Sequence, residues 1–382
     1  MKKNRRQWVE VSRGALVHNV GQFRKLLGHE TKILAVVKAN AYGHGLQEVS
    51  KIVLEAGADW LGVNSVEEGV RLRESHVLAP ILVLGAAASG DLEAACANDL
   101  RLTVYDRATI EALSRTARKL RKKIPVHLKL ETGTHRQGLP PEELGKFVKL
   151  VQKLPGLSLE GLSSHFANIE DTTSSTYPEY QLKIFLDLVD RLQKNRIEIP
   201  VKHMSSTASS ILFPETYFDM VRIGIGLYGL WPSKETFLSC RLRNRTPPEL
   251  RPVLSWKARI AQIKKVPEGS FIGCGCTYRT TRPTRLAVIP IGYYDGYSRS
   301  LSNASYVLVR GKRAFVRGRV AMNFIMADVT DIPGVKPADE VTLIGRDGKE
   351  VIPAETLASL AGTISYEILA RINPLIPRVI VP

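Results

Sequence analysis

A lysine follows an apolar run near the start of the chain. Residues 33–37 form an unbroken apolar run of strand length, Lys38 comes next, and Gly43 and Gly45 precede an amphipathic stretch that starts at Leu46. This order of strand, lysine, glycine turn and helix predicts that Lys38 lies at the carboxyl end of a parallel strand, where α/β folds keep their chemistry. A desolvated lysine there has a lowered pKa and can form a Schiff base with a carbonyl compound. On Lys38 alone, a strand-end lysine that reaches water is the alternative interpretation.

The residues around Lys38 carry a family resemblance. The segment AVVKANAYGHG, residues 35–45, is similar to the cofactor-lysine motif of alanine racemases, which use pyridoxal 5′-phosphate (PLP). Racemisation removes the α-proton of an amino acid from one face and returns a proton to the other, while PLP accepts the electrons. The resemblance therefore implies that Lys38 binds PLP and, once released from it, acts as one of two bases.

The resemblance implies that Tyr278 is the second base. The segment 275–279, GCTYR, matches the racemase segment whose tyrosine acts on the opposite face of the substrate. A tyrosine needs a fixed cation close by to act as a base near neutral pH. Taken alone, Tyr278 is an ordinary strand-end tyrosine. In the family this tyrosine reaches the other subunit's site, which implies a homodimer with active sites at the subunit interface.

A second segment resembles the family's substrate-binding loop. Residues 129–138, KLETGTHRQG, are similar to the pattern K-x-D-T-G-M-x-R-x-G, which implies that Arg136 holds the substrate carboxylate and lowers the pKa of Tyr278 by its charge. The planar guanidinium suits a carboxylate, although an isolated arginine on a loop is usually a surface residue. The family often carbamylates the lysine equivalent to Lys129, which then pairs with the arginine. Glu131 and Thr134 depart from the usual Asp and Met.

Two further matches concern the pyridine ring. The segment 164–167, SHFA, implies that His165 lies beside the ring, and VRIGI at 221–225 implies that Arg222 faces the ring nitrogen. An arginine stays protonated, so the ring nitrogen stays unprotonated, which weakens the electron sink and suppresses transamination. Fold relatives that decarboxylate amino acids have a carboxylate there. Arg222 therefore favours a racemase over a PLP decarboxylase.

The resemblance also implies residues for the PLP phosphate and for the substrate path. The phosphate residues are Tyr42, Thr207, the backbone of Gly224 and Ile225, and Tyr366. Thr207 follows a segment that departs from the family pattern, but its hydroxyl can still donate to phosphate. Tyr293 is implied to line the access path, and the Met322 backbone to bind the substrate carboxylate. Asn323 stands where the family commonly has Asp, so we hypothesise a wider choice of substrates.

The elements that position these residues follow from the length and pattern. A chain of 382 residues predicts two domains. Eight apolar strand segments alternate with helical patterns such as 108–120, 142–153 and 178–194, which predicts a (β/α)8 barrel at 1–235. An open doubly wound sheet is the alternative. The eight segments are 33–38, 60–63, 81–84, 102–105, 126–130, 158–162, 201–204 and 220–223.

A mostly β domain is predicted at 236–382, with residues 1–12 as a candidate strand partner. Residues 231–234 and 241–248 are predicted to be a linker. The later strand segments are 253–263, 286–291, 306–309, 314–316, 324–329 and 340–344, and the two helices are 354–361 and 366–370.

Composition excludes several classes. No apolar segment of a secretory signal follows the basic start, and no run approaches a membrane span, so we expect a cytoplasmic protein that does not contact a membrane. Four cysteines in 382 residues do not make a disulfide framework, and Cys274 and Cys276 lack a second ligand pair, so no metal is predicted. The net charge of +17 raises a nucleic-acid partner. The basic clusters at 118–123, 241–245 and 310–319 lack interleaved aromatic residues, which favours a solvated basic surface instead.

The motifs cover both predicted domains in family order. They imply an alanine racemase that interconverts L- and D-alanine and supplies D-alanine for peptidoglycan. A racemase for other or more amino acids is the closest alternative, and a non-catalytic PLP-binding protein is the non-enzymatic one. A binding protein would give no reason to retain Tyr278 and a whole β domain.

Overall fold

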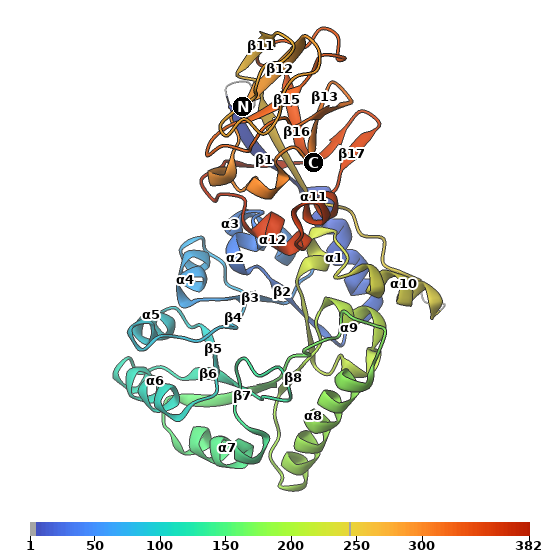
Figure 1. The fold of residues 1–382 in the computed structure, drawn as a ribbon. Coiled ribbons are helices and arrows are strands. Elements are labelled where there is room, and N and C mark those ends of the chain that lie inside the picture. Colours follow the sequence, from blue (N-terminus) through green and yellow to red (C-terminus); the bar gives the residue numbers. More distant parts are fainter. Residues whose placement is uncertain (1–4, 244–245) are drawn as a thin grey trace. The chain divides into compact units, whose positions relative to one another are not determined.

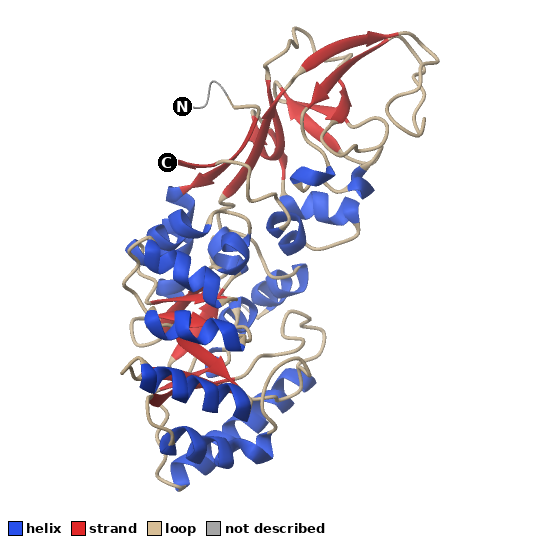
Figure 2. Cartoon of the chain, turned by 90° about the vertical axis from the view of Figure 1, so that its left-hand side faces the viewer, coloured by secondary structure: helices blue, strands red, loops and turns tan. Residues whose placement is uncertain are grey.

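The computed structural model describes residues 5–243 and 246–382 (Figure 1, Figure 2). Its contacts divide the chain into two units. The barrel unit comprises Ala15–Ala41 and Leu46–Pro252, and the sheet unit comprises Met1–Gly14, Tyr42–Gly45 and Val253–Pro382. Residues 236–252, which the sequence analysis placed in the β-rich domain, cluster with the barrel unit.

The barrel unit is built on eight parallel strands. They are β2 (Lys32–Val36), β3 (Trp60–Val63), β4 (Ile81–Val83), β5 (Arg101–Val104), β6 (Ile124–Lys129), β7 (Leu157–Ser163), β8 (Val201–His203) and β9 (Met220–Ile223). The pairing order is β8-β7-β6-β5-β4-β3-β2-β9, and the amide of Arg222 donates to the Ser205 carbonyl at 3.1 Å across the β8–β9 seam. The sheet is thus a nearly closed barrel, which confirms the predicted (β/α)8 architecture over an open sheet.

Helices surround these strands in Figure 1. They are α1 (Arg13–Leu27), α3 (Leu46–Glu55), α4 (Val66–Glu74), α5 (Leu92–Ala97), α6 (Arg107–Lys119), α7 (Leu144–Lys153), α8 (Thr176–Lys194), α9 (Thr207–Leu212) and α10 (Lys234–Leu242). The short turn α2 (Lys38–Tyr42) and the 3-10 turns η1 (Ser89–Asp91), η2 (Pro141–Glu143), η3 (Pro214–Thr216) and η4 (Ile225–Tyr228) complete the set. Strands β2, β3, β4 and β5 are almost wholly buried because helices cover the outside and side chains fill the inside.

Two expectations for the barrel unit were wrong in detail. The helix expected at 142–153 is divided, because Pro141 starts the 3-10 turn η2 and α7 follows it. Part of the expected linker is the helix α10, whose N-cap Ser233 accepts a hydrogen bond from the Thr236 amide. Its basic composition concealed a short helix that buries Thr236 and Cys240. Residues 244 and 245 of that expected linker lie outside the described residues.

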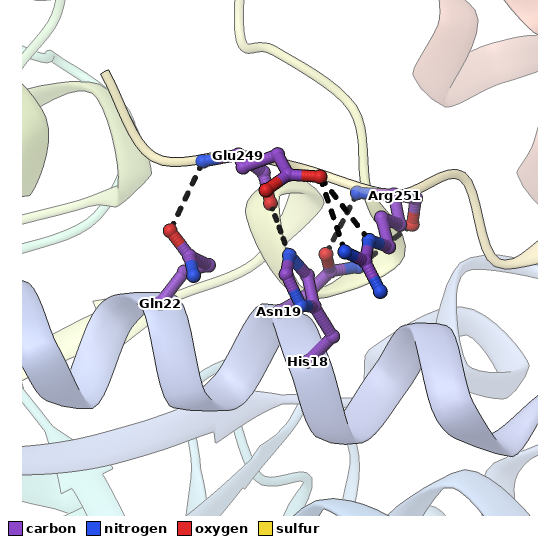
Figure 3. A network of polar contacts seen from close by, with 5 residues as sticks. All are labelled: His18, Asn19, Gln22, Glu249 and Arg251. Carbon is purple, nitrogen blue, oxygen red and sulfur yellow. Dashed lines mark hydrogen bonds and ion pairs between the residues drawn. The ribbon is translucent and has the colours of Figure 1, made fainter. Parts of the chain in front are cut away.

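A polar network holds the segment after α10 against α1 (Figure 3). Asn19 donates to the Arg251 carbonyl at 2.9 Å and accepts from the Arg251 amide at 2.8 Å. His18 Nε2 lies 2.7 Å from the Glu249 carbonyl, and Gln22 accepts from the Glu249 amide at 3.1 Å. These contacts explain why residues up to 252 cluster with the barrel unit.

The sheet unit contains two antiparallel-rich sheets. The first has the order β14-β13-β16-β10-β1-β18, with β17 paired to β16, and the second has the order β11-β12-β15. The strands are β1 (Gln7–Ser12), β10 (Leu254–Arg259), β11 (Gln262–Val266), β12 (Thr284–Ile289), β13 (Tyr306–Val309), β14 (Lys312–Phe315), β15 (Ile325–Asp328), β16 (Glu340–Asp347), β17 (Glu350–Ile352) and β18 (Arg378–Val381). The helical segments are α11 (Ala354–Ala361), α12 (Ser365–Ala370), η5 (Tyr293–Asp295) and η6 (Arg299–Leu301).

Strand β1 lies between two partners that come much later in the sequence. It pairs antiparallel with β10 and parallel with β18. The single run expected at 253–263 is two strands, β10 and β11, which belong to different sheets. Within the described ranges, no helix has the length and apolar character needed to cross a membrane.

Candidate active site

Lys38 lies two residues beyond the end of β2, in a left-handed turn. The backbone φ angles of Ala39, Asn40, Ala41 and Tyr42 are 55°, 54°, 53° and 52°. This conformation costs L-residues roughly 1–2 kcal/mol each, so other contacts must hold it. The Ala39 amide donates to Glu68 at 2.7 Å, and Asn40 accepts from the Leu46 amide at 2.9 Å. The sequence indicated a turn here, but it gave no signal for four left-handed non-glycine residues.

The surroundings of Lys38 favour its neutral amine. Burial lowers the pKa of Lys38, and the positive charges of Arg136 and Arg222 lower it further, whereas Glu68 opposes them. A neutral amine is the form that attacks a carbonyl carbon. The strand-end position predicted for Lys38 therefore coincides with the electrostatics that a Schiff-base lysine needs.

Lys129, at the end of β6, forms a cationic group with Lys38, Arg136 and Arg222, whose positive charges act on one another. Burial, followed by the charges of Arg222 and Arg136, lowers its pKa to about 8. Its Nζ lies 3.4 Å from Gln137 Oε1. A lysine with this pKa is partly neutral near physiological pH, and the neutral amine is the form that reacts with carbon dioxide.

A carboxylate shapes the loop that carries Arg136. Glu131 accepts hydrogen bonds from the backbone amides of Gly133 at 2.7 Å, Thr134 at 2.5 Å and Arg136 at 3.2 Å. Burial alone would raise the pKa of Glu131, but hydrogen bonds from the loop amides hold it below its ordinary value. The departure from Asp to Glu thus keeps an anion that folds the Arg136 loop.

The side chain of Arg222, on β9, is held by five hydrogen bonds. Its Nη1 donates to His203 Nδ1 at 2.8 Å and to the His203 carbonyl at 3.0 Å. Its Nη2 donates to the carbonyls of Ser164 and Met204 at 2.9 and 2.8 Å, and to His165 Nδ1 at 3.2 Å. These contacts fix the plane of the guanidinium and use only its two Nη atoms. Nε makes no hydrogen bond to any residue that the structure describes.

His165 is neutral beside this guanidinium. Burial lowers its pKa well below the ordinary value, and Arg222, Arg136 and Lys129 add to the effect. Because Arg222 can only donate, His165 Nδ1 accepts and the ring hydrogen is on Nε2. The residue that the resemblance implies beside the pyridine ring is therefore an uncharged imidazole.

Thr207 and the following turn provide donors for an anion. The Thr207 hydroxyl accepts from the Gly224 amide at 3.1 Å, so its own hydrogen is directed elsewhere. The amide of Gly224 is therefore engaged, while η4 begins at Ile225. Among the residues predicted for the phosphate, Thr207 and Ile225 are the donors that this geometry leaves to a ligand.

The sheet unit holds the other predicted phosphate residues. The rings of Tyr42 and Tyr366 lie with their centroids 6.0 Å apart. Burial raises the pKa of Tyr42 to about 12, so its hydroxyl stays protonated and acts as a donor. Tyr366 is the second residue of α12.

Tyr278 lies at the base of a loop in the sheet unit. The loop is closed by a hydrogen bond of 3.0 Å from the Ile272 amide to the Tyr278 carbonyl. The guanidinium of Arg317 lies 4.8 Å from the centre of the Tyr278 ring. The sequence analysis named Arg136 as the cation that acts on this tyrosine. Within the sheet unit, the cation that lies against its ring is Arg317, and no spacing in the sequence connects these two residues.

The remaining predicted residues, Tyr293, Met322 and Asn323, lie in the 3-10 turn η5 and in a bend at 322–323, and these two segments contact each other. The amide of Tyr293 donates to the Ala321 carbonyl, and the amide of Tyr294 donates to the Met322 carbonyl, both at 3.0 Å. The side chains of Tyr293 and Met322 are exposed. Asn323 follows Met322 at the exposed end of this pair.

The side chains of the barrel unit suit PLP, an anionic pyridine aldehyde. The buried lysine Lys38 can react with the aldehyde, Arg222 has a free Nε–H for the ring nitrogen, and Thr207 can donate to the phosphate. Among residues 5–243 and 246–382, no group of three His, Cys, Asp or Glu side chains is arranged to hold a metal ion. The sequence analysis overlooked His127, which contacts His203, and Glu160, which contacts His127. Histidines at inward-facing strand positions are the signal that was missed.

Comparisons with known proteins concern the whole chain. The model of the alanine racemase N-terminal domain matches residues 11–232, and that of the C-terminal domain matches residues 253–380. Alanine racemase of Halothermothrix orenii is 44% identical over 371 residues, which is 97% of this chain and 96% of that protein. The structure of alanine racemase from Clostridium difficile 630 superposes with a TM-score of 0.92 at 34% identity, covering 100% of this chain and 97% of that one.

A third comparison concerns a different amino acid. Histidine racemase from Leuconostoc mesenteroides superposes with a TM-score of 0.89 at 30% identity, covering 99% of both chains. The fold thus occurs in amino-acid racemases, and both domain models match in order. The chain belongs to the alanine racemase family of PLP-dependent isomerases.

Proposed function

We propose that this protein interconverts L- and D-alanine by a two-base mechanism. The observation that carries the proposal is the hydrogen-bonded Arg222, a fixed cation that shares its surroundings with Lys38 and Arg136. A permanently protonated guanidinium opposite the ring nitrogen leaves that nitrogen unprotonated. This favours return of the proton to the substrate Cα over transamination or decarboxylation.

Each residue of the barrel unit has one task in this proposal. When bound, PLP supplies the electron sink that makes the substrate α-proton acidic. Lys38 Nζ binds the cofactor, and after its release it holds or gives a proton on one face of Cα. Arg222 Nε donates to the ring nitrogen, and Thr207 and the Ile225 amide bind the phosphate together with Tyr42 and Tyr366.

The proposal also assigns residues to the substrate carboxylate. We assign Arg136 to it, with the Met322 backbone amide as a further donor, because a planar guanidinium pairs with a carboxylate through two hydrogen bonds. Carbamylation of Lys129 would turn a cation into an anion, R–NH2 + CO2 giving R–NH–COO⁻ and a proton. The product would pair with Arg136 and relieve the repulsion that lowers the Lys129 pKa to about 8.

The proposed proton carrier on the opposite face is Tyr278 of the partner subunit in a homodimer. Support comes from exposed apolar side chains of the sheet unit, which also holds Tyr278. Phe271, Tyr293, Tyr294, Met322 and Phe324 are between 42% and 58% exposed. Soluble monomers rarely leave such groups together in water, so a second copy is the proposed cover. Tyr293 would line the access path at this interface.

A broader choice of substrate is the second candidate. The histidine racemase has the same fold at 30% identity, so related sites accept a larger side chain. Asn323 replaces the usual aspartate, which removes a negative charge from the substrate path. Assays with alanine, serine, lysine, arginine and histidine would decide between the candidates, and turnover of alanine alone would exclude the broader one.

We also propose that the product D-alanine is used for peptidoglycan and that the protein works in the cytoplasm. Cys96, Cys240, Cys274 and Cys276 are all free thiols in the structure, as a reducing compartment would keep them.

The decisive experiment follows L-alanine with PLP-loaded protein in heavy water by NMR and by chiral analysis. D-alanine with deuterium at Cα is the expected result. Exchange without inversion would mean that Lys38 acts and Tyr278 does not. The proposal would be overturned if no amino acid showed either exchange or inversion.

A further inference from the structure

A chain of hydrogen bonds crosses the barrel interior behind Arg222. Arg222 Nη1 lies 2.8 Å from His203 Nδ1, and His203 Nε2 lies 2.8 Å from His127 Nδ1. His127 Nε2 lies 3.1 Å from Glu160 Oε2, which also accepts from Arg101 Nε at 2.9 Å. Four side chains from four neighbouring strands, with Arg101 from a fifth, are thus linked in one line.

The chemistry of the donors gives this line a single direction. Arg222 can only donate, so His203 Nδ1 must accept and His203 carries its hydrogen on Nε2. That hydrogen is donated to His127 Nδ1, which leaves the His127 hydrogen on Nε2. Glu160 accepts it, because a carboxylate has acceptors only. Both imidazoles are therefore neutral and both are Nε2–H tautomers.

The environment of the histidines agrees with this assignment. His127 is wholly buried and His203 is 1% exposed. Burial lowers the pKa of each histidine, and the charge of Arg222 lowers both further, while the contact with Glu160 opposes the effect at His127. A proton on either ring would place two N–H groups face to face in the core. Neutral rings are the only arrangement that satisfies every contact.

A bulge and a glycine in β7 make room for these hydrogen-bonded side chains. The pairing of β6 with β7 shifts between Val126 and His127, so that Leu159 and Gly161 have partners and Glu160 is the bulged residue. A bulge re-aims the side chain that it carries. At Gly161 an added Cβ would lie 2.2 Å from His127 Nδ1, so only glycine leaves space for that imidazole.

The far end of the line is more exposed to water than its centre. The side chains of Glu160 and Arg101 are each 21% exposed. Trp60 packs against the His127 ring with centroids 5.8 Å apart, and Arg101 lies 4.7 Å above the Trp60 ring. A partly solvated carboxylate is thus connected through two buried imidazoles to the guanidinium at the active site.

We propose that Glu160, His127 and His203 form a positioning relay that fixes the orientation of Arg222 toward the pyridine ring. The inference rests on the proposed function for the role of Arg222, but the hydrogen-bond direction does not. Glu160 acts as the terminal acceptor that selects one tautomer of each histidine. Without it, both rings can turn to Nδ1–H tautomers, and a hydrogen on His203 Nδ1 would displace Arg222 Nη1.

The first test measures the tautomers in the PLP-loaded wild-type protein. Ring ¹⁵N chemical shifts of histidine distinguish a protonated from an unprotonated nitrogen. We expect two buried histidines with hydrogen on Nε2 that stay neutral at pH 7, assigned through His127→Gln and His203→Gln. Protonated rings, or hydrogen on Nδ1 of either residue, would overturn the relay whatever the activity.

The second test removes the acceptor. Glu160→Leu is expected to mix the tautomers in the ¹⁵N spectrum, lower kcat on the order of 10-fold to 100-fold, and leave KM within about two-fold. It should also raise the fraction of bound cofactor converted to its amine form during turnover, because the ring nitrogen is no longer held unprotonated. If Glu160→Leu mixes the tautomers but leaves kcat and the loss of cofactor unchanged, the proposed relay is overturned.

Two controls separate the relay from simple stability. Glu160→Gln keeps an amide oxygen that accepts from His127, so it should restore the wild-type spectrum and most of kcat. Glu93→Leu makes the same change at an exposed carboxylate on α5 and should change neither readout. If Glu160→Leu does not fold, the wild-type spectrum and Glu160→Gln still decide. A wild type that racemises nothing but shows the predicted tautomers would refute the proposed function and leave the relay standing.

Discussion

The two regions that carry the proposed bases differ in how firmly the chain holds them. In the barrel unit, Arg222 makes five hydrogen bonds to buried partners, and the Arg136 loop is folded around Glu131. In the sheet unit, Tyr278 lies on a loop of mostly exposed residues, held by one backbone hydrogen bond and by Arg317 above its ring. The proposed cofactor-binding side chains of the barrel unit are thus held by many contacts within the chain. The proposed second base has few such contacts, so in the proposal its position depends on a second copy of the chain.

The largest expected effect is on the barrel side. Lys38→Ala removes both the cofactor attachment and one base, so racemisation should fall by about 10⁴-fold or more. Borohydride reduction followed by mass spectrometry should find PLP attached to the wild type at Lys38 and not to the variant. Lys32→Ala, at the exposed start of the same strand, is the matched control. Retained PLP attachment in Lys38→Ala would assign the cofactor to another lysine.

A slightly smaller loss should follow from the sheet side. Tyr278→Phe keeps the ring under Arg317 but removes the hydroxyl, and kcat for inversion should fall about 10²–10⁴-fold. Deuterium exchange at Cα of one enantiomer should continue, because Lys38 is intact. Tyr294→Phe, an exposed neighbour of Tyr293, should behave like the wild type. Equal loss of exchange and inversion in Tyr278→Phe would erase the proposed division between the two regions.

The cationic group of the barrel unit predicts a pH-dependent change in stability. The pKa of Lys129 is about 8 in the folded protein against an ordinary 10.5. Between pH 8 and pH 10.5 the unfolded chain binds more protons than the folded protein, so the stability of the wild type rises with pH in this window. Below pH 8 Lys129 is charged in both states, and the folded protein bears the full free-energy cost of burying that charge. In carbonate-free buffer, Lys129→Met should therefore raise the melting temperature at pH 7, and the gain should vanish near pH 10.5.

Two additions complete that experiment. Bicarbonate should raise the melting temperature of the wild type at pH 8 and leave Lys129→Met unchanged, since a carbamate replaces repulsion by attraction. Lys149→Met, at an exposed position of α7, controls for the loss of a charge. A gain that persists undiminished at pH 10.5 would mean that packing, and not charge, explains the change.

The smallest expected effect probes the rigidity of the barrel interior. Gly161→Ala places a methyl group against the His127 ring, and overpacking of this kind costs about 1–3 kcal/mol of unfolding free energy. Gly21→Ala in α1 meets no atom within 4 Å and should stabilise by up to about 1 kcal/mol. Urea unfolding midpoints measure both. If Gly161→Ala leaves the free energy of unfolding unchanged, the barrel interior adapts to the added methyl group and is no more rigid than the Tyr278 loop.

The sequence predicted the elements well where periodicity decides them. The eight barrel strands and the barrel closure followed from apolar runs that alternate with helical patterns, and the bounds at 60–63 and 220–223 agree with β3 and β9. Helix α10 was missed because a serine N-cap stood within a basic, proline-bearing stretch. A local pattern cannot separate such a helix from a linker when few of its residues are buried.

The site was predictable only as far as motifs reach along the chain. Lys38 could be named because it follows a strand and Arg222 because its segment resembles a family motif, and the charge of Arg222 acts on Lys38 in the structure. Arg317 and Glu160 could not be named, since their contacts with Tyr278 and His127 arise from tertiary packing and from a bulge. Sequence patterns identify residues that touch a ligand more readily than the residues that orient them.

The position of β1 has a consequence for synthesis on the ribosome. This strand, Gln7–Ser12, is made first, yet its partners are β10 at Leu254–Arg259 and β18 at Arg378–Val381. At translation rates of about 5–20 residues per second, β1 waits roughly ten to fifty seconds for β10. During that time its backbone donors and acceptors are exposed to other nascent chains. Assembly of this sheet therefore cannot be completed until β18 has left the exit tunnel.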